Sequence, residues 1–223
     1  MDLLEAIKAR HSVRQYKNMP IETSLAERLH ERVAQINSES GMHIQLVTNE
    51  PQAFSSKLAH YGKFSGVTNY FAMIGRKGKD LDERIGYFGE QLVLFAQTLG
   101  LNTCWVGLTY KKVPDVLHME KDEKLVCLIA VGYGVNQGAA HKTKKPGDVS
   151  KAKGEQPEWF RQGVAAALLA PTALNQQKFR FELCDDHTVK ARAGWGFYTE
   201  TDLGIVKYHF EIAAGKEHFN WRT

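Results

Sequence analysis

The segment from Ala170 to Phe181 restricts the fold of this chain more than any other part of the sequence. An apolar run over residues 164–169 has the character of a buried helix, and Pro171 ends it because proline has no amide hydrogen and restricts the residue before it. After a polar turn, residues 179–183 alternate between apolar and charged side chains, which is typical of a half-buried strand. This order indicates a domain that contains both helices and a sheet.

The turn between this helix and strand offers one hydroxyl and three side-chain amides, from Thr172, Asn175, Gln176 and Gln177. Side-chain amides both donate and accept hydrogen bonds, so such a turn suits the polar edge of a flat heterocycle. The alternative is a structural turn capped by Thr172 and Asn175. The segment resembles the Ala-Pro-Ser-Ala-X-Asn-X-Gln-Pro-Trp turn of the FMN-dependent nitroreductase family. That resemblance implies FMN contacts from Pro171, Thr172, Asn175 and Gln177.

The composition argues against several classes of protein. The chain has 223 residues, enough for one large or two small domains, and its net charge of +4 is spread along the chain, so we expect no nucleic-acid-binding surface. No apolar run approaches the roughly 18 residues of a membrane span, and the first residues lack the basic region of a signal peptide. The three cysteines, Cys104, Cys127 and Cys184, have no metal-binding spacing, so we expect reduced thiols, no metal and a cytoplasmic protein.

A second motif follows a short helical pattern at residues 2–9. Arg10, Ser12 and Arg14 fall within five residues, and two guanidinium groups with a hydroxyl can bind one phosphate. The alternative is a solvated basic turn. The motif resembles the Arg-X-Ser-X-Arg signature of nitroreductases, with His11 at the position between the first arginine and the serine. The resemblance implies that Arg10, His11, Ser12 and Arg14 hold the FMN phosphate.

The strongest helical pattern covers residues 84–99, has Gly100 as a natural end, and predicts a central buried helix. The apolar run 101–108 after it is either a buried strand with Trp105 in the core or a strand that also approaches a ligand. The sequence Leu-Gly-Leu-X-Thr-Cys-Trp-X-Gly at residues 99–107 resembles the segment after the central helix of nitroreductases. The resemblance implies that the backbone at Trp105, Val106 and Gly107 approaches the flavin ring.

A basic segment at residues 141–157 is interpreted as a linker between two halves of the chain. Nitroreductases have a similar Lys-Pro stretch at this place, and the resemblance implies that Lys144 and Lys145 supply further phosphate contacts.

The chain also shows an internal repeat. Helix 24–34, turn 35–42 and strand 43–48 can be laid over helix 161–171, turn 172–179 and strand 180–185, with Arg180 137 residues after His43. A weaker match places Gly204 over Gly89, an offset of 115 residues. The repeat predicts a pseudo-twofold axis within one chain.

The two motifs are divided between the copies: the arginine motif occurs only in the first and the Pro-Thr turn only in the second. Nitroreductases are homodimers in which each FMN site takes one motif from each subunit. The chain is therefore similar to the single-chain tandem nitroreductases of the TM type. The expected fold is α+β and nitroreductase-like, with two half-domains forming an intramolecular pseudo-dimer of antiparallel or mixed sheets flanked by helices. We expect halves at 1–140 and 158–223, and one complete FMN site per chain.

The resemblance implies an FMN-dependent oxidoreductase with NAD(P)H and a small organic electron acceptor as partners. No side-chain acid or base is required, so no catalytic residue is predicted. Lys178 and Phe179 stand where Pro-Trp is usual, which leaves the acceptor open. Trp195, Phe197 and Tyr198 either line the substrate face or pack structurally. We expect a monomer, although a dimer is compatible with the sequence. The alternatives are a flavin-binding sensor or carrier without turnover, and an α/β protein that binds no flavin.

Overall fold

The computed structural model describes residues 1–185 and 187–222. Asp186 and Thr223, both in the expected second half, lie outside the described residues. The chain forms two compact units. The N-terminal unit contains residues 9–81 and 91–140, and the C-terminal unit contains residues 1–8, 82–90 and 141–223.

These units differ from the expected halves at three places. Residues 1–8, expected in the first half, belong to the C-terminal unit. The segment 141–157, expected as a linker, belongs to the C-terminal unit and contains the short helix α5 (Pro146–Val149) and the strand β5 (Ser150–Ala152). The central helix α4 (Leu81–Thr98) contributes residues 82–90 to the C-terminal unit and residues 91–98 to the N-terminal unit. Sequence order alone therefore does not define the units.

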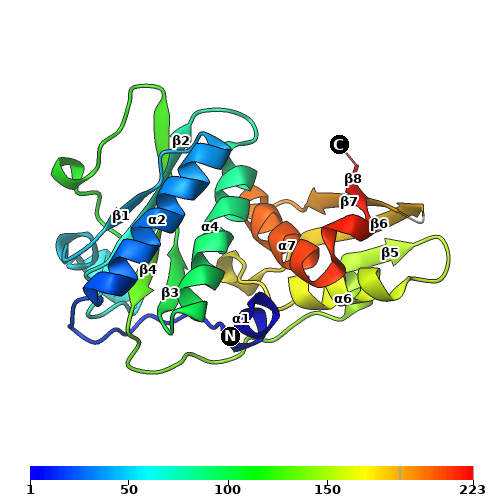
Figure 1. Ribbon diagram of the computed structural model, residues 1–223, viewed down its shortest axis with the longest axis horizontal. Helices are drawn as coiled ribbons and strands as arrows, with labels where there is room; N and C mark the ends of the chain where they lie inside the picture. The colour runs from blue at the N-terminus through cyan, green and yellow to red at the C-terminus, as the bar shows by residue number, and fades with distance from the viewer. Residues whose placement is uncertain (186, 223) are drawn as a thin grey trace. The chain divides into compact units, whose positions relative to one another are not determined.

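The N-terminal unit is built on a four-stranded antiparallel sheet (Figure 1). Its strands, in spatial order, are β1 (Gln45–Val47), β2 (Tyr70–Arg76), β4 (Glu123–Gly132) and β3 (Asn102–Val106). Strand β4 pairs with a strand on each side, with Ile129 opposite Phe71 on β2 and opposite Trp105 on β3. Its central position explains why residues 125–131 are uniformly apolar, because both faces of this strand are buried.

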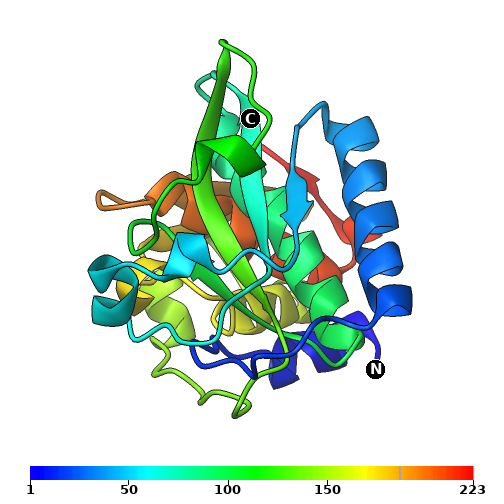
Figure 2. The ribbon, with the colours of Figure 1, turned by 90° about the vertical axis from the view of Figure 1, so that its left-hand side faces the viewer.

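Helix α2 (Thr23–Ser40) and the second part of α4 lie together in this unit, as Figures 1 and 2 show. The Arg32 guanidinium donates to Gln91 Oε1 at 2.9 Å. Helix α2 is longer than the predicted helix 24–34, so the expected turn at 35–42 is helical as far as Ser40. It ends where Gly41 takes a left-handed conformation (φ 67°) and donates its amide to the carbonyl of Asn37.

One face of the sheet is covered by short elements, namely η1 (Gln52–Phe54), α3 (Lys57–Tyr61) and η2 (Pro114–Val116). The rings of Phe54 and Phe64 pack with centroids 5.3 Å apart, and both belong to the same buried cluster as alternate residues of β2. Successive side chains of β2 thus point to opposite faces of the sheet, and both faces are apolar.

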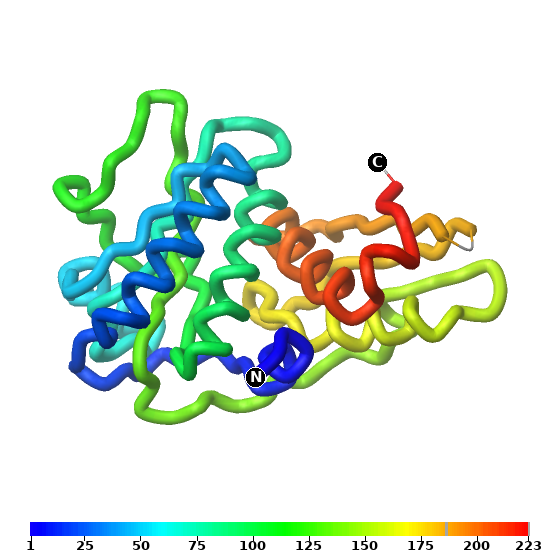
Figure 3. The backbone as a smooth tube through the Cα atoms, viewed as in Figure 1, coloured from blue at the N-terminus to red at the C-terminus, as the bar shows by residue number. Residues whose placement is uncertain are grey.

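The C-terminal unit contains a mixed sheet, whose strands are labelled in Figure 1 and whose chain path can be followed in Figure 3. Its strands, in spatial order, are β5, β6 (Phe179–Asp185), β7 (Thr188–Ala193) and β8 (Asn220–Trp221). Strands β6 and β7 are antiparallel, and the two outer strands run parallel to their neighbours. The alternating pattern predicted for residues 179–183 is confirmed, because Phe179, Phe181 and Leu183 are buried.

Helices α6 (Glu158–Ala167) and α7 (Thr199–Ala214) of this unit contribute to one aromatic core. The unit also contains most of α1 (Leu3–Ala9) and the 3₁₀ turns η3 (Ala173–Asn175) and η4 (Lys216–His218). The Phe210 ring on α7 lies 4.7 Å from that of Phe181 and 5.7 Å from that of Phe160. Over the described residues, the helices are too short or too polar to cross a membrane. The predicted α+β fold, with sheets flanked by helices, is confirmed.

Candidate functional site

The predicted phosphate motif lies in the N-terminal unit, along the outer edge of β3. The Val13 amide donates to the carbonyl of Thr103 at 3.0 Å, and Ser12 forms a parallel bridge with the same residue. Three residues after Val13, the Tyr16 amide donates to the carbonyl of Ser65 at 2.9 Å. The motif is therefore an ordered, extended segment between β3 and the loop at Ser65, and is not a freely solvated basic turn.

Three side chains of this motif converge on one buried group, the thiol of Cys104 on β3. Burial raises the pKa of this thiol, while the charge of Arg14, a hydrogen bond from Ser12 and the charge of Arg10 each act to lower it. Arg10 is only 3% exposed. Two guanidinium groups and a hydroxyl thus lie close together, which is the donor set that a phosphate group requires.

The remaining predicted residues of this unit are neighbours of the motif. Trp105 and Val106 lie on β3, and Gly107 follows its last residue. The loop after β4 packs against His11, since a Cβ placed on Gly138 would lie 2.7 Å from that of His11. The arginine motif and the Trp105–Gly107 segment therefore belong to the same unit, the motif beside β3 at Thr103 and the segment at the end of this strand.

The predicted polar turn lies in the C-terminal unit and has a strained backbone. Leu174, Asn175 and Gln177 have φ angles of 53°, 52° and 46°, in the left-handed region that side chains other than glycine rarely adopt. Such conformations cost roughly 1–3 kcal/mol each and cluster at functional sites.

The amides of this turn bind the segment just before α5. Asn175 Nδ2 and Gln177 Nε2 donate to the carbonyl of Lys142 at 2.9 and 2.8 Å. Gln177 Oε1 accepts from the Lys144 amide at 2.8 Å, and Lys144 Nζ donates to the carbonyl of Gln177 at 2.9 Å. Thr172 Oγ1 accepts from the Gln177 amide at 3.1 Å. Many of the hydrogen-bonding groups that the sequence suggests for a ligand are therefore bonded within the protein, where they stabilise the turn.

The other two predicted residues of this unit flank the same structure. Pro171 is buried at the start of the turn. The Lys145 amide donates to Asp148 Oδ2 at 3.1 Å as the chain enters α5. The structure thus brings Lys144 directly onto the turn, whereas Lys145 begins the next helix.

Sequence analysis did not assign Gln176 and Asp202, which organise this region. Asp202 Oδ1 accepts from the Ala173 amide, and its Oδ2 accepts from Gln176 Nε2, both at 2.8 Å. Burial raises the pKa of Asp202 to about 6, while the two hydrogen bonds act to lower it. The available signal was an aspartate in the first turn of a helix that is otherwise largely apolar.

The loop 194–198 is attached to this turn and exposes two aromatic side chains. Gln176 Nε2 donates to the carbonyl of Phe197 at 2.7 Å, and Lys178 Nζ donates to that of Trp195 at 3.0 Å. The side chains of Trp195 and Phe197 are 94% and 69% exposed. Aromatic side chains held in solvent are typical of binding surfaces.

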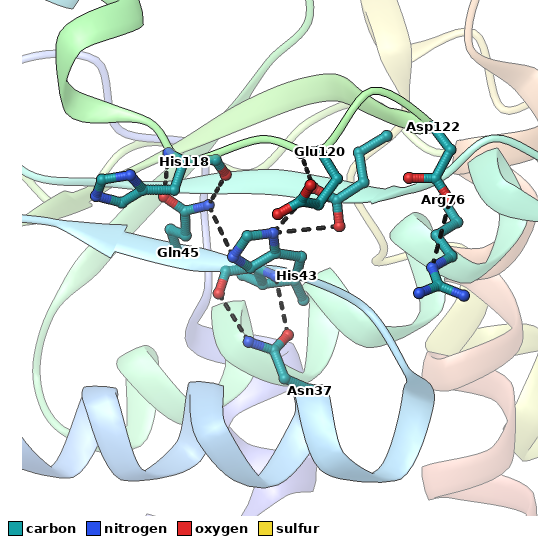
Figure 4. A network of polar contacts seen from close by, with 9 residues as sticks. Asn37, His43, Gln45, Arg76, His118, Glu120 and Asp122 are labelled. Carbon is teal, nitrogen blue, oxygen red and sulfur yellow. Dashed lines mark hydrogen bonds and ion pairs between the residues drawn. The ribbon is translucent and has the colours of Figure 1, made fainter.

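A separate polar network joins β1 to the segment before β4 (Figure 4). His43 Nδ1 lies 2.9 Å from Glu123 Oε2, and Gln45 Nε2 lies 3.3 Å from His43 Nε2. Asn37 binds the backbone of Ile44 through both ends of its amide. These groups satisfy one another, so the network has a structural role. Within residues 1–185 and 187–222, no group of three His, Cys, Asp or Glu side chains is placed to hold a metal ion.

The fold of this chain is that of nitroreductases of known structure. A putative nitroreductase from Thermotoga maritima is 21% identical, with a TM-score of 0.67, and the match covers 96% of this chain and 83% of that protein. A putative nitroreductase in complex with FMN from Desulfovibrio desulfuricans is 16% identical, with a TM-score of 0.54, and the match covers 70% of this chain and 98% of that protein. No curated protein sequence matches the chain.

The sequence itself defines the family. The model of the putative TM nitroreductase family matches residues 2–214, and the chain belongs to this family. The resemblance based on the arginine motif and the Pro-Thr turn is thereby confirmed.

Proposed function

We propose that this protein is an FMN-dependent oxidoreductase that uses NADH or NADPH to reduce a small organic acceptor. The observation that carries the proposal is the convergence of Arg10, Ser12 and Arg14 beside β3 in the N-terminal unit. Family membership and the FMN complex of the Desulfovibrio protein support the choice of ligand. Bound FMN supplies the redox chemistry by accepting hydride and passing electrons on, so the protein contributes binding and orientation.

The first set of proposed FMN-binding residues holds the phosphate. Arg10 and Arg14 provide the positive charge, Ser12 provides a hydroxyl, and His11 lies on the same extended segment. Since Arg10 is almost completely buried, its guanidinium has little freedom to reorient, which favours a fixed anion site. Lys144 and Lys145 are proposed as further cations for the phosphate.

The second set contacts the flavin ring and ribityl chain. It comprises the backbone of β3 and its end, at Trp105, Val106 and Gly107, together with the turn residues Pro171, Thr172, Asn175 and Gln177. The hydroxyl hydrogen of Thr172 remains available for a ligand, because its oxygen only accepts from the Gln177 amide within the described residues. The aromatic loop 194–198 is proposed to line the substrate face.

The chain is also proposed to be a tandem form with one complete site. When the short helices η1 and α3 between β1 and β2 and the 3₁₀ turns η3 and η4 are set aside, the order helix, strand, strand, helix, strand occurs twice, first as α2, β1, β2, α4 and β3, and then as α6, β6, β7, α7 and β8. In both series the first two strands are antiparallel neighbours. The arginine motif precedes only the first series, and the Pro-Thr turn occurs only in the second. One FMN per monomeric chain follows from this division.

The first experiment is an absorbance spectrum of the purified protein, repeated under anaerobic conditions with NADPH and with NADH. We expect about one FMN per chain and bleaching by at least one nicotinamide. Two FMN per chain would refute the single site, and a protein that takes up no added FMN would refute the proposal. A flavin that stays oxidised would instead favour the sensor or carrier, for which the attachment of the loop 194–198 by Gln176 and Lys178 is the supporting observation.

Two substitutions test the two sets of residues. Arg10→Ala and Asn175→Ala are each expected to weaken FMN retention at least tenfold. Arg76→Ala is the matched control, because Arg76 is an exposed arginine of the N-terminal unit and forms its ion pair with Asp122 at the surface. If only one of the two test variants lost FMN, the single-site proposal would be wrong.

A further inference from the structure

We infer that Asp202 is a positioning residue that orients the Gln176 amide and thereby attaches the aromatic loop 194–198 to the polar turn 172–177. The inference rests on the proposed function only where it assigns this turn and loop to the flavin and its substrate. The attachment itself involves residues of the C-terminal unit alone.

The carboxylate of Asp202 is used entirely as a hydrogen-bond acceptor. Its side chain lies in the first turn of α7 and is 2% exposed. One oxygen binds the Ala173 amide and the other binds Gln176 Nε2. No cation forms an ion pair with Asp202 in the part of the chain that the structure describes. A buried carboxylate without a cation is costly, so its retention here points to a specific structural task.

That task follows from the chemistry of the Gln176 amide. The Nε2 group has two hydrogens, and it donates one to Asp202 Oδ2 and the other to the carbonyl of Phe197 at 2.7 Å. If the amide were turned by 180°, its oxygen would face the carboxylate and both bonds would be lost. Asp202 therefore selects the one orientation of Gln176 that binds the loop.

The centre of the loop has few contacts with the core, because the side chains of Trp195 and Phe197 project into solvent. Backbone carbonyls and amides hold the rest of the loop: the Gly194 amide donates to the carbonyl of Lys178 at 2.7 Å, and Thr199 Oγ1 donates to that of Gly196 at 3.3 Å. The Lys178 ammonium binds the Trp195 carbonyl. The loop also lies tightly against Gln176, since a Cβ on Gly196 would be 2.6 Å from Gln176 Oε1. Loss of the Gln176 bond should therefore loosen the loop at Phe197 without unfolding α7.

Limited chymotrypsin digestion of the full chain without added FMN tests the attachment. Trp195, Phe197 and Tyr198 are cleavage sites, and cleavage requires the loop to open locally. Asparagine has one acceptor oxygen where aspartate has two, so in Asp202→Asn the side chain cannot accept from both the Ala173 amide and Gln176 Nε2, and we expect cleavage in the loop to become about tenfold faster. Glu200→Gln is the matched control, because it removes an exposed acid from the same helical turn. The control should be cleaved at the wild-type rate.

A double-mutant cycle separates positioning from general destabilisation. Gln176→Met removes the amide but keeps the length of the side chain, and should speed cleavage as much as Asp202→Asn. Adding Asp202→Asn to Gln176→Met should then have no further effect, because both act through one bond. Additive effects, or wild-type cleavage in a folded Asp202→Asn, would overturn the inference. If Asp202→Asn fails to fold, Gln176→Met alone decides, and its cleavage at the wild-type rate would overturn the inference.

Steady-state kinetics then connect the attachment to the proposed function. In Asp202→Asn the KM for the organic acceptor should rise about tenfold, with FMN content and kcat changed less than twofold. A protein that binds no FMN would refute the proposed function but leave the digestion result valid. Faster cleavage with an unchanged KM would show that the loop is attached as inferred and does not contact the acceptor.

Discussion

Gly86 of α4 and Gly204 of α7 have reciprocal positions at a single helix crossing in the C-terminal unit. A Cβ on Gly86 would lie 1.9 Å from the carbonyl oxygen of Thr201, and a Cβ on Gly204 would lie 1.9 Å from that of Glu83. Each glycine thus meets the carbonyl three residues before the other. Such reciprocity is the property of a local twofold axis.

This crossing corrects one detail of the predicted repeat. The sequence alignment places Gly204 over Gly89, whereas the reciprocal contacts relate Gly204 to Gly86. The difference of three residues is close to one helical turn of about 3.6 residues, so both alignments put the same face of the helix in register. The crossing supports the proposed tandem arrangement.

The crossing predicts a strong effect of added side-chain volume. Gly86→Ala and Gly204→Ala should each lower the free energy of unfolding by roughly 1–3 kcal/mol or more, because a methyl group would overlap a backbone carbonyl. Urea denaturation measures this change. Gly147→Ala is the control, since a Cβ there meets nothing within 4 Å and the variant should stay near the wild-type stability. If Gly86→Ala and Gly204→Ala were as stable as the control, the close approach of the α4 and α7 backbones would be contradicted.

The buried pair of Glu90 and His209 predicts a different pattern. His209 Nε2 lies 2.8 Å from Glu90 Oε1, and Nδ1 lies 3.1 Å from the carbonyl of Ala166, with both side chains completely buried. The carbonyl requires a hydrogen on Nδ1. Glu90→Leu should therefore lower the free energy of unfolding by about 1–3 kcal/mol, because it leaves a buried nitrogen of His209 without a partner.

Glu90→Gln is the conservative comparison for this pair. Its side-chain amide offers both a donor and an acceptor to Nε2 of His209, so most of the stability lost in Glu90→Leu should be retained. The same denaturation experiment measures both variants. Equal losses in the two would show that the hydrogen bond does not contribute.

The pKa of Asp202 predicts a pH dependence of stability. An aspartate has a pKa of about 3.9 when unfolded, and burial raises that of Asp202 to about 6. The folded state therefore binds this proton more tightly, and the contribution of Asp202 to stability is full below pH 4 and is lost as the pH rises through about 6. The loss amounts to roughly 2–3 kcal/mol.

The measurement is the difference in unfolding free energy between the wild type and Asp202→Asn at pH 4.5 and pH 7. The hydrogen-bond partners of Asp202, the Ala173 amide and Gln176, are uncharged, so they do not titrate in this range. The difference should move in favour of the variant as the pH rises. A difference that is independent of pH would contradict the raised pKa.

The cysteines are predicted to differ in reactivity. Burial raises the pKa of the Cys104 thiol, and Cys127 is also buried, whereas Cys184 is partly exposed. Since the thiolate is the reactive form, iodoacetamide at pH 8 should modify Cys184 at least tenfold faster than the other two. Mass spectrometry of the digested protein gives the three rates. Faster modification of Cys104 would contradict this prediction and would mean that the arginine motif beside β3 opens readily.

Local patterns in the sequence predicted most elements but not all of their ends. The alternation of Phe179, Phe181 and Leu183 and the apolar run of β4 are strong signals, because burial on one or both faces of a sheet leaves a direct mark on residue type. The segment 146–152 gave no such signal. Its helix and strand are too short for a period, and β5 forms only by pairing with β6, which the local sequence cannot encode.

The candidate site shows the same division. The residue types in the arginine motif and in the Pro-Thr turn were sufficient to predict each segment as a candidate binding segment. They did not predict that Asn175 and Gln177 bind the Lys142–Lys144 segment, since those partners are more than 30 residues away along the chain. Asp202 was missed because its bond to Gln176 spans 26 residues.

The sequence by itself determined the family, the types of the main helices and strands, and the two motifs proposed to bind FMN. These depend on residue type and short-range spacing, which a chain carries whether or not it is folded. Only the tertiary structure decided which donors meet which acceptors, as in the contact of Asp202 with Gln176, and where two backbones approach closely enough to require Gly86 and Gly204. Hydrogen bonds and helix contacts between distant residues depend on the path of the whole chain, and that path exists only once the chain is folded.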